Sequence, residues 1–299
     1  MTVPEYPDSR QILLEDKPLF DKIFMSKQPE VSTYTFTNLF AWREPYKTGI
    51  SRIGESIIVH HNLENRVCLE PMGGDDIKPI VAEVLARSQG LEICFERISS
   101  EVSALFVDDP GFIVEPDREN SDYVYLASDL INLHGRKFDG KRNHVNRFKS
   151  LYKYEYEKIT EQTAIECLEF TDRWCEERSC RKTKGMRMEQ LAMHQMLENF
   201  DSLKICGGAI RIDGVIAAFS LGEALNPETL VVHAEKADQK IEGLYQLINN
   251  EFCIHEANNY EYVNREQDLG IPGLRKAKKS YHPVKMIDTY TMRRAASSI

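Results

Sequence analysis

The sequence has no apolar run long enough to form a membrane-spanning helix. Its best candidate, residues 214–222, is flanked by the charged residues Asp213 and Glu223, whereas a span needs about 18 apolar residues. The first ten residues, MTVPEYPDSR, contain no basic cluster followed by an apolar stretch, so they do not resemble a secretory signal. We therefore expect no membrane span and a cytoplasmic location.

Paired cysteines and common catalytic motifs are also missing. The seven cysteines form no CxxC pair, which favours reduced thiols. Cys175 and Cys180 are close in sequence, but no second pair completes a zinc site, so we expect no metal. The sequence contains no GxSxG elbow, Walker loop or HExxH motif. These absences argue against the corresponding hydrolase, NTPase and zinc-protease classes.

The composition is that of an ordinary globular protein. The chain has 299 residues, of which 42% are hydrophobic and 28% charged, and this length favours two domains. Its formal net charge of -9 argues against a dedicated nucleic-acid-binding protein. Basic residues nevertheless gather at 134–153, 178–187 and 275–279. These segments suit an anionic ligand, and solvated helix faces explain each of them equally well.

The hydrophobic periodicity predicts one order of elements twice. In the second half it gives a strand at 154–159, helices at 164–177 and 188–200, strands at 203–212, 215–224 and 229–236, a helix at 243–256, a strand at 260–264, a helix at 273–281 and a closing strand at 285–292. Asp213-Gly214 is a strong hairpin signal. In the first half the same order runs through 11–15, 19–25, 38–42, 49–53, 57–61, 66–70, 77–85, 91–98 and 101–108, with an extended segment from 112.

Several segments carry a resemblance to a known family. They are YTFTNL at 34–39 with Trp42, KRNHVNRF at 141–148, GLYQ at 243–246 with Asn249, Glu251 and Phe252, YVNREQDLG at 262–270, GLRKAK at 273–278, and Ser280-Tyr281. On these residues the chain resembles the soluble, DUF2156-like relatives of the C-terminal domain of phosphatidylglycerol lysyltransferase. The lipid-modifying lysyltransferases carry a long membrane-embedded region ahead of this domain, and we expect no such region in this chain.

The resemblance implies an α+β fold of two tandem GNAT-like (acyl-CoA N-acyltransferase-like) domains, each a mixed sheet flanked by helices. We expect the N-terminal domain at residues 1–133 and the C-terminal domain, with the site, at 134–299. Fold alone does not determine the chemistry. The activity therefore has to be argued from the site residues.

In this fold the donor's anionic part lies at the N-terminus of the helix after the third central strand, where free N–H groups and the helix dipole favour negative charge. The predicted donor and anion-binding residues are Lys240, Gly243, Tyr245, Lys141 and Arg142. Acyl-CoA is the less favoured donor, because Tyr245 is bulky where a backbone should approach the phosphates and Glu242 would repel them. Helix punctuation by Gly243 and a half-buried Tyr245 are equally good explanations.

Strand alternation over 230–236 predicts Val231, His233 and Glu235 on one face. With Glu223 nearby, His233 and Glu235 form the best acid/base pair in the sequence, able to take a proton from an attacking amine. A buried polar network that joins the strands is the competing interpretation, and the more frequent one.

A second polar group follows the next strand, at an edge where sites are common. Glu266 is a further catalytic candidate, and the predicted acceptor-binding residues are Asn264, Arg265, Asp268, Arg275 and Lys278. Arg265 is suited to hold a carboxylate or phosphate, and Glu266 or Asp268 an amino group. An arginine–carboxylate network that pins the loop is an equally good explanation.

These residues predict an acyl or aminoacyl transferase that joins an activated carboxyl group to the amine or hydroxyl of a small-molecule acceptor, without a covalent enzyme intermediate. The resemblance implies aminoacyl-tRNA as donor, with acyl-CoA less favoured, and it makes tRNA a candidate partner. The alternative is a non-catalytic protein that binds a small anionic or amino-acid-like ligand at the same place. Nucleic-acid binding alone is disfavoured by the acidic charge.

Overall fold

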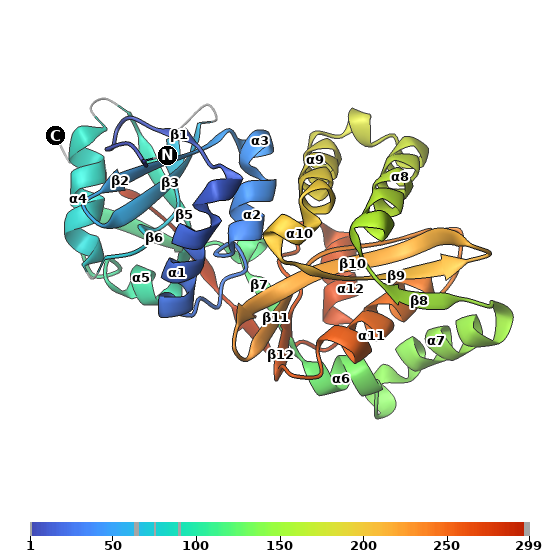
Figure 1. The fold of residues 1–299 in the computed structure, drawn as a ribbon. Coiled ribbons are helices and arrows are strands. Elements are labelled where there is room, and N and C mark those ends of the chain that lie inside the picture. Colours follow the sequence, from blue (N-terminus) through green and yellow to red (C-terminus); the bar gives the residue numbers. More distant parts are fainter. Residues whose placement is uncertain (1, 63–65, 75, 89–90, 296–299) are drawn as a thin grey trace.

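The computed structural model describes residues 2–62, 66–74, 76–88 and 91–295, which form two seven-stranded sheets with helices around them (Figure 1). The first half contains β1 (Arg10–Gln11), η1 (Leu14–Asp16), α1 (Lys17–Lys27), α2 (Phe36–Ala41), α3 (Arg43–Tyr46), β2 (Thr48–Ile53), β3 (Ser56–Asn62), β4 (Arg66–Cys68), α4 (Ile77–Arg87), β5 (Ile93–Ser99), α5 (Ser100–Ala104), β6 (Phe112–Pro116), η2 (Arg118–Asn120), β7 (Asp122–Leu126) and α6 (Ala127–Asn132).

The second half contains η3 (Arg136–Phe138), α7 (Asp139–Leu151), β8 (Glu155–Lys158), α8 (Glu161–Arg178), η4 (Cys180–Lys182), α9 (Lys184–Glu198), α10 (Phe200–Leu203), β9 (Cys206–Ile212), β10 (Val215–Asn226), β11 (Thr229–Ala237), α11 (Leu244–Glu256), β12 (Tyr262–Asn264), α12 (Pro272–Lys279), β13 (Lys285–Ile287) and β14 (Thr289–Arg294). Most predicted elements are present, within a few residues of their predicted bounds. The main exceptions are the opening strand, which is only two residues long, and the closing strand.

The two sheets share one plan. Their strand orders are β1-β2-β3-β4-β5-β14-β6 and β13-β7-β12-β11-β10-β9-β8. Each sheet contains one parallel pair, β4 with β5 and β11 with β12, and a helix connects the two strands of each pair. A parallel pair requires such a crossover connection. The repeated order of elements predicted from the sequence is therefore confirmed.

Two strands are exchanged between the halves. β14, the last described strand, lies between β5 and β6 of the first sheet, and β7 lies between β12 and β13 of the second sheet. The predicted closing strand at 285–292 is wrong as a single element, because the chain passes at Asp288 from one sheet to the other. The predicted domain boundary after residue 133 stays a prediction. β7 lies before this boundary and β14 lies after it, and each strand pairs within the sheet of the other half.

Local sequence explains the best-predicted elements. The tight turn between β9 and β10 has positive φ at Asp213 (50°) and Gly214 (79°), as a two-residue hairpin turn requires. At the start of α8 the Thr160 side chain accepts a hydrogen bond from the backbone N–H of Thr163, which caps the helix. The hairpin sets the register between β9 and β10.

The largest apolar core runs through both halves. Phe36 and Phe40 of α2 belong to the same buried cluster as Met193 and Met196 of α9, and the two helices are in contact. Smaller cores lie under α11 in the second half and under α4 in the first. The shared core fixes the two halves relative to each other. Among the described residues, no helix is both long and apolar enough to cross a bilayer.

Candidate functional site

A β-bulge at His233 decides which way the polar side chains of β11 point. The flanking register pairs are Val232–Gly222 and Ala234–Leu221, which leaves His233 without a partner on β10. A bulge interrupts the alternation of side chains. The predicted shared face of His233 and Glu235 is therefore wrong: His233 contacts Glu223 and Glu266, whereas Glu235 contacts Asn249 of α11.

His233 lies between two carboxylates. Its side chain is fully buried, and each ring nitrogen is 2.9 Å from a carboxylate oxygen, one of Glu223 and one of Glu266. Burial lowers the pKa of His233, but the hydrogen bonds and charges of Glu223 and Glu266 outweigh it and raise the pKa to about 9. At neutral pH the ring is an imidazolium that bridges two acids, so it has no free nitrogen with which to take a proton.

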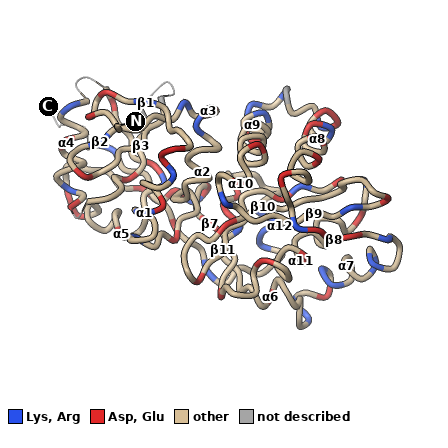
Figure 2. Tube along the Cα trace, viewed as in Figure 1, with Lys and Arg blue, Asp and Glu red and all other residues tan. Residues whose placement is uncertain are grey.

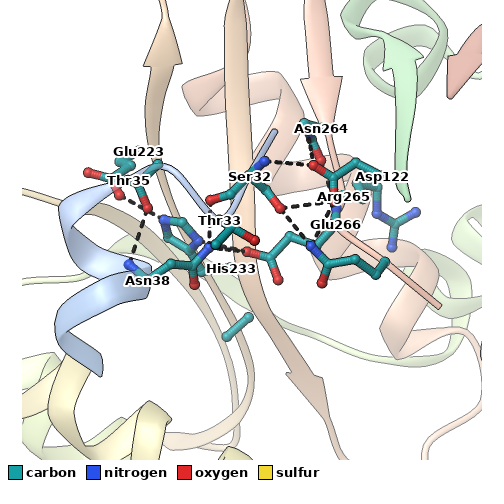
Figure 3. Close-up of polar contacts among 12 residues, drawn as sticks. Ser32, Thr33, Thr35, Asn38, Asp122, Glu223, His233, Asn264, Arg265 and Glu266 are labelled. Carbon is teal, nitrogen blue, oxygen red and sulfur yellow. Dashed lines mark hydrogen bonds and ion pairs between the residues drawn. The ribbon is translucent and has the colours of Figure 1, made fainter. Parts of the chain in front are cut away.

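The carboxylate of Glu266 also reaches the first half of the chain (Figure 3). Asn38 of α2 donates its amide to Glu266 Oε1 at 2.9 Å and to the Ser32 carbonyl at 2.8 Å. Glu266 has a positive φ of 55°, and its N–H donates to the Asn264 side chain at 2.8 Å. The predicted catalytic residues His233 and Glu266 thus form part of a network that joins the halves.

Asp122, at the start of β7, is the second anchor of this network. It accepts hydrogen bonds from the Ser32 N–H (2.6 Å), the Ser32 hydroxyl (2.9 Å), Asn264 Nδ2 (3.0 Å) and Gln267 Nε2 (2.7 Å). Burial raises the pKa of Asp122 to about 6, against the lowering effect of these hydrogen bonds. Asn264, predicted to bind an acceptor, is fully buried and held by this contact.

On the α11 side, strands β11 and β12 separate. Their parallel pairing ends at Val231 and Asn264, while β11 continues to Ala237. Beyond this point Arg265 Nη2 donates to Glu235 Oε1 at 3.1 Å, and Asn249 Nδ2 donates to Glu235 Oε2 at 2.9 Å. One further side-chain atom of each residue, Arg265 Nη1 and Asn249 Oδ1, is buried without a hydrogen-bond partner among the described residues. Such orphaned atoms are rare in folded proteins and mark a place where a ligand or water belongs.

Two lysines complete this group, which we call the junction cluster: Lys141, Glu235, Asn249, Arg265 and Lys278. Arg265 and Lys141 lie over the ring of Tyr281, 4.7 and 4.1 Å from its centroid, and Lys278 donates to the Arg265 carbonyl. The pKa values of both lysines are lowered, mainly by burial and secondly by the charge of Arg265. The pKa of Lys141 lies below its ordinary value, and that of Lys278 falls to about 8.

The junction cluster is short of negative charge. It holds three basic side chains and one carboxylate, and Glu266 and Asp122 offset part of the charge of Lys278. Half-buried like charges are held together at a cost unless an anion lies between them. The cluster is therefore suited to bind a carboxylate or phosphate through Arg265 and Lys141. It unites Lys141, predicted on the donor side, with Arg265 and Lys278, predicted on the acceptor side.

Asp268 and Arg275 lie outside this cluster. Arg275 donates to both oxygens of Asp268, at 2.8 and 2.9 Å, and the Tyr123 hydroxyl donates at 2.6 Å. The Arg275 hydrogen bonds hold the pKa of Asp268 well below its usual range, despite burial. This fully buried carboxylate holds the loop before α12 in place. Asp268 and Arg275 thus form the arginine–carboxylate network that the sequence analysis offered as the alternative to acceptor binding.

The other predicted donor residues are also apart from the cluster. Gly243, with φ 87°, packs under α7: a Cβ there would lie 2.9 Å from the His144 carbonyl oxygen. Tyr245 packs on the apolar core beneath α11. Arg142 bonds to Asp139 and to the Leu133 carbonyl close to its own helix.

Lys240 borders a groove at the end of β11. The lysine is exposed and pairs with Glu177 of α8 at 2.7 Å. The groove has a volume of about 700 Å³ and lies between α8, the tip of the β9–β10 hairpin and residues 238–241. Its wall includes Phe170, Trp174 and Ile241. Of the five predicted donor residues, only Lys240 lines this groove and only Lys141 belongs to the junction cluster.

Comparison with known proteins supports the fold described above, two mixed sheets flanked by helices. The profile of the family described as phosphatidylglycerol lysyltransferase, C-terminal, matches residues 25–293. The chain belongs to this family. The expected α+β fold, with a mixed sheet flanked by helices in each half, is present.

Three solved structures illustrate the likeness. A conserved protein of unknown function from Bacteroides thetaiotaomicron VPI-5482 is 36% identical, with a TM-score of 0.88 over 96% of this chain and 99% of that one. The C-terminal (DUF2156) domain of a putative lysylphosphatidylglycerol synthetase from Agrobacterium fabrum is 15% identical, with a TM-score of 0.68 over 95% and 93%. L-PGS from Bacillus licheniformis is 17% identical, with a TM-score of 0.64 over 100% and 96%.

Sequence reasoning missed several residues of the site. They are Ser32, Asn38, Asp122, Asn249 and Gln267. Asn38 and Asn249 lie in segments that carry the family resemblance, which was a usable signal. Asp122 had none, because only the exchange of β7 brings it to the second sheet. Ser32 had none either, and it joins the network through its hydrogen bonds to Asp122. Among the described residues, no group of three or more His, Cys, Asp or Glu side chains is arranged to hold a metal.

Proposed function

We propose that this protein transfers an activated acyl or aminoacyl group to an amine or hydroxyl acceptor at the junction cluster. The observation that supports this most is the excess of positive charge around Arg265, where the buried Arg265 Nη1 and Asn249 Oδ1 have no hydrogen-bond partner in the described part of the chain. A substrate that carries an acidic group and a hydrogen-bond donor satisfies both atoms. The family name describes the transfer of a lysyl group to phosphatidylglycerol, which is the same class of reaction.

The proposed reaction is a direct displacement. The acceptor nitrogen or oxygen bonds to the carbonyl carbon, and the bond from that carbon to the ribose oxygen or thiol sulfur of the donor breaks. The acceptor loses one proton, and the leaving oxygen or sulfur takes one up, so the donor departs as the free ribose hydroxyl or thiol. Glu235 is the proposed proton acceptor, with Lys278 in its neutral form as the other nearby candidate. Lys278 suits this role because its pKa is lowered to about 8 by burial and by the charge of Arg265.

Aminoacyl-tRNA is the proposed donor in preference to acyl-CoA. A pyrophosphate that approached the backbone at Gly243 would meet the His144 carbonyl, because α7 covers that position. α7 carries Lys141, Arg142, Arg147 and Lys149, and a second basic stretch follows α8 (Figure 2). These surfaces suit the phosphates of an RNA stem, and such binding weakens steeply with salt. A tRNA partner is therefore part of the proposal.

A second candidate function is binding without catalysis. Both oxygens of Glu235 already accept hydrogen bonds, from Arg265 and Asn249, and His233 is protonated. An acceptor amine would have to displace Asn249 to reach the carboxylate. This arrangement favours a protein that only holds a small anionic or amino-acid-like ligand in the cluster.

One experiment separates the two functions. The full chain is incubated with total charged tRNA or with an acyl-CoA set, each with a panel of amines and hydroxyl compounds, and product is measured by mass spectrometry. We expect turnover with charged tRNA, a loss of at least about 100-fold in Glu235→Gln, and little change in Glu189→Gln. Glu189 is the matched control, because it pairs with Lys236, the next residue of β11. If neither donor class gives turnover, and if Glu235→Gln leaves the ligand-induced thermal shifts unchanged, only the binding function remains.

A further inference from the structure

The groove between α8 and the β9–β10 hairpin is separate from the junction cluster, because no member of that cluster lines it. Its volume of about 700 Å³ lies within the range of small-molecule pockets. Two contacts bridge it at the last turn of α8. Glu177 pairs with Lys240, and Arg178 donates to the Gln239 side chain. These contacts join α8 to the loop after β11 and hold the two walls of the groove together.

The walls of the groove are largely apolar. Phe170 and Trp174 line it from α8, and Ile212, Val215 and Ile241 line it from the hairpin and the loop after β11. Val215 is 56% exposed, and Ile212 and Ile241 are half-buried. Accessible apolar side chains that gather in a hollow are typical of ligand-binding pockets. The body of a ligand that fits this groove is therefore apolar.

Two arginines of α8 border these apolar walls. Helical spacing places Arg173 and Arg178 on either side of the face that carries Phe170 and Trp174. The two guanidinium groups lie over these rings, 6.0 Å from the centroid of Phe170 and 4.8 Å from that of Trp174. In the described part of the chain neither arginine makes an ion pair, and Arg173 makes no hydrogen bond. An unpaired guanidinium is suited to hold a carboxylate through two parallel hydrogen bonds.

The charge of the lining matches a single negative charge. Three basic and two acidic side chains line the groove, which leaves one positive charge. The acids are Glu177, which pairs with Lys240, and Asp238, which accepts a hydrogen bond from the Lys240 N–H at 2.8 Å. Both acids would repel a dianion such as a phosphate monoester. A monocarboxylate meets the unpaired Arg173 with less of this repulsion.

We propose that the groove binds a small monocarboxylate with an apolar body. The body packs between Val215, Ile241 and Trp174, and the carboxylate pairs with Arg173. Trp174 also donates its indole N–H to the carbonyl of Ala237, the last residue of β11, at 3.1 Å. The groove is thus a second ligand site, next to the strand that carries Glu235 of the junction cluster.

The test titrates the full chain with phenylacetate and with isocaproate, and follows tryptophan fluorescence. Trp42 and Trp174 are the two tryptophans of the sequence, so Trp42→Phe leaves Trp174 as the single reporter, and calorimetry of the wild type checks the affinity. We expect saturable binding of at least one acid, and binding of its neutral amide that is weaker by about tenfold or more. Arg173→Gln should weaken binding of the acid by the same factor. Arg187→Gln, which changes an exposed arginine of α9 outside the groove, should have no effect.

A second pair of variants tests the apolar wall. Val215→Asp places a negative charge in the groove and should weaken binding of the acid by about tenfold or more. Ile165→Asp is the matched control, because Ile165 is on α8, is 52% exposed and does not line the groove. This control should bind the acid like the wild type.

Several outcomes would overturn the proposal. Binding of neither acid would remove the site. Equal binding of the acid and its amide, or equal binding of the acid by Arg173→Gln and Arg187→Gln, would mean that the groove does not recognise a carboxylate. Equal binding by Val215→Asp and Ile165→Asp would place the ligand elsewhere. The assay contains no donor or acceptor, so its result is independent of the proposed transferase activity.

Discussion

Replacing His233 by glutamine tests the central network most sharply. Glutamine can still donate one hydrogen bond to Glu223 or Glu266, but it carries no charge. In the folded protein these two carboxylates, against the effect of burial, raise the pKa of His233 from 6.5 to about 9. Because the folded-state pKa is the higher one, the charged ring stabilises the fold fully below about pH 6.5, and this contribution is lost as the pH rises through 9. At about 1.4 kcal/mol per pKa unit, it amounts to roughly 3 kcal/mol.

The assay is urea unfolding of the wild type and His233→Gln between about pH 6 and pH 10. Titrations common to both proteins cancel in the difference between their free energies of unfolding. We expect this difference to shrink by roughly 3 kcal/mol over that range. His194→Gln is the matched control, because His194 is 27% exposed and bonds to Asp172 at the surface. Imidazole NMR of the wild type should give the same pKa.

Two results would refute the reasoning. A difference that stays constant from about pH 6 to pH 10 would mean that His233 has the same charge folded and unfolded. An imidazole that titrates at or below its ordinary value would mean that the two carboxylates do not outweigh burial.

Two further predictions concern packing and the pinned loop. Gly243→Ala should lower the free energy of unfolding by roughly 1–3 kcal/mol, because φ is 87° and the new Cβ would meet the His144 carbonyl. The control Gly140→Ala, in open space on α7, should be neutral or stabilising. Equal midpoints of the two variants in thermal unfolding would contradict this prediction. Asp268→Asn should cost about 3–5 kcal/mol. The Arg275 hydrogen bonds lower the pKa of Asp268, so the ionised carboxylate stabilises the fold above the ordinary aspartate pKa, and this stabilisation is lost as the pH falls. The free energy of unfolding of the variant should therefore fall less steeply than that of the wild type at acidic pH. An equally steep fall would argue against the pairing.

Much of the fold followed from local patterns in the sequence. The Asp213-Gly214 turn, the helices α8, α9 and α11 and the three central strands depend on periodicity and turn chemistry within a short window. The exchange of β7 and β14 does not, because strand pairing between distant segments leaves no local signature. A strand such as 285–292 looks continuous until Asp288 takes it to the other sheet.

The candidate site was predictable only in part. Four residues of the junction cluster were named from the sequence, and the structure brings them together: Arg265 from its place after a strand, Glu235 from strand alternation, and Lys141 and Lys278 from basic stretches. Their relative arrangement was not predictable, because a bulge at His233 reverses the face of Glu235. Alternation is a rule for regular strands, and a single extra residue changes every position after it.

The most direct test of the junction cluster compares two arginines that differ in place but not in chemistry. Arg265→Lys removes the guanidinium that pairs with Glu235, and Arg275→Lys removes the one that pins Asp268. The measurement is the single-turnover rate of transfer from charged tRNA to an acceptor identified by the proposed mass-spectrometric screen, with thermal midpoints recorded alongside. We expect Arg265→Lys to slow transfer by about 100-fold or more at an unchanged midpoint, and Arg275→Lys to lower the midpoint but retain transfer. Equal transfer rates in the two folded variants would contradict a site at the junction cluster.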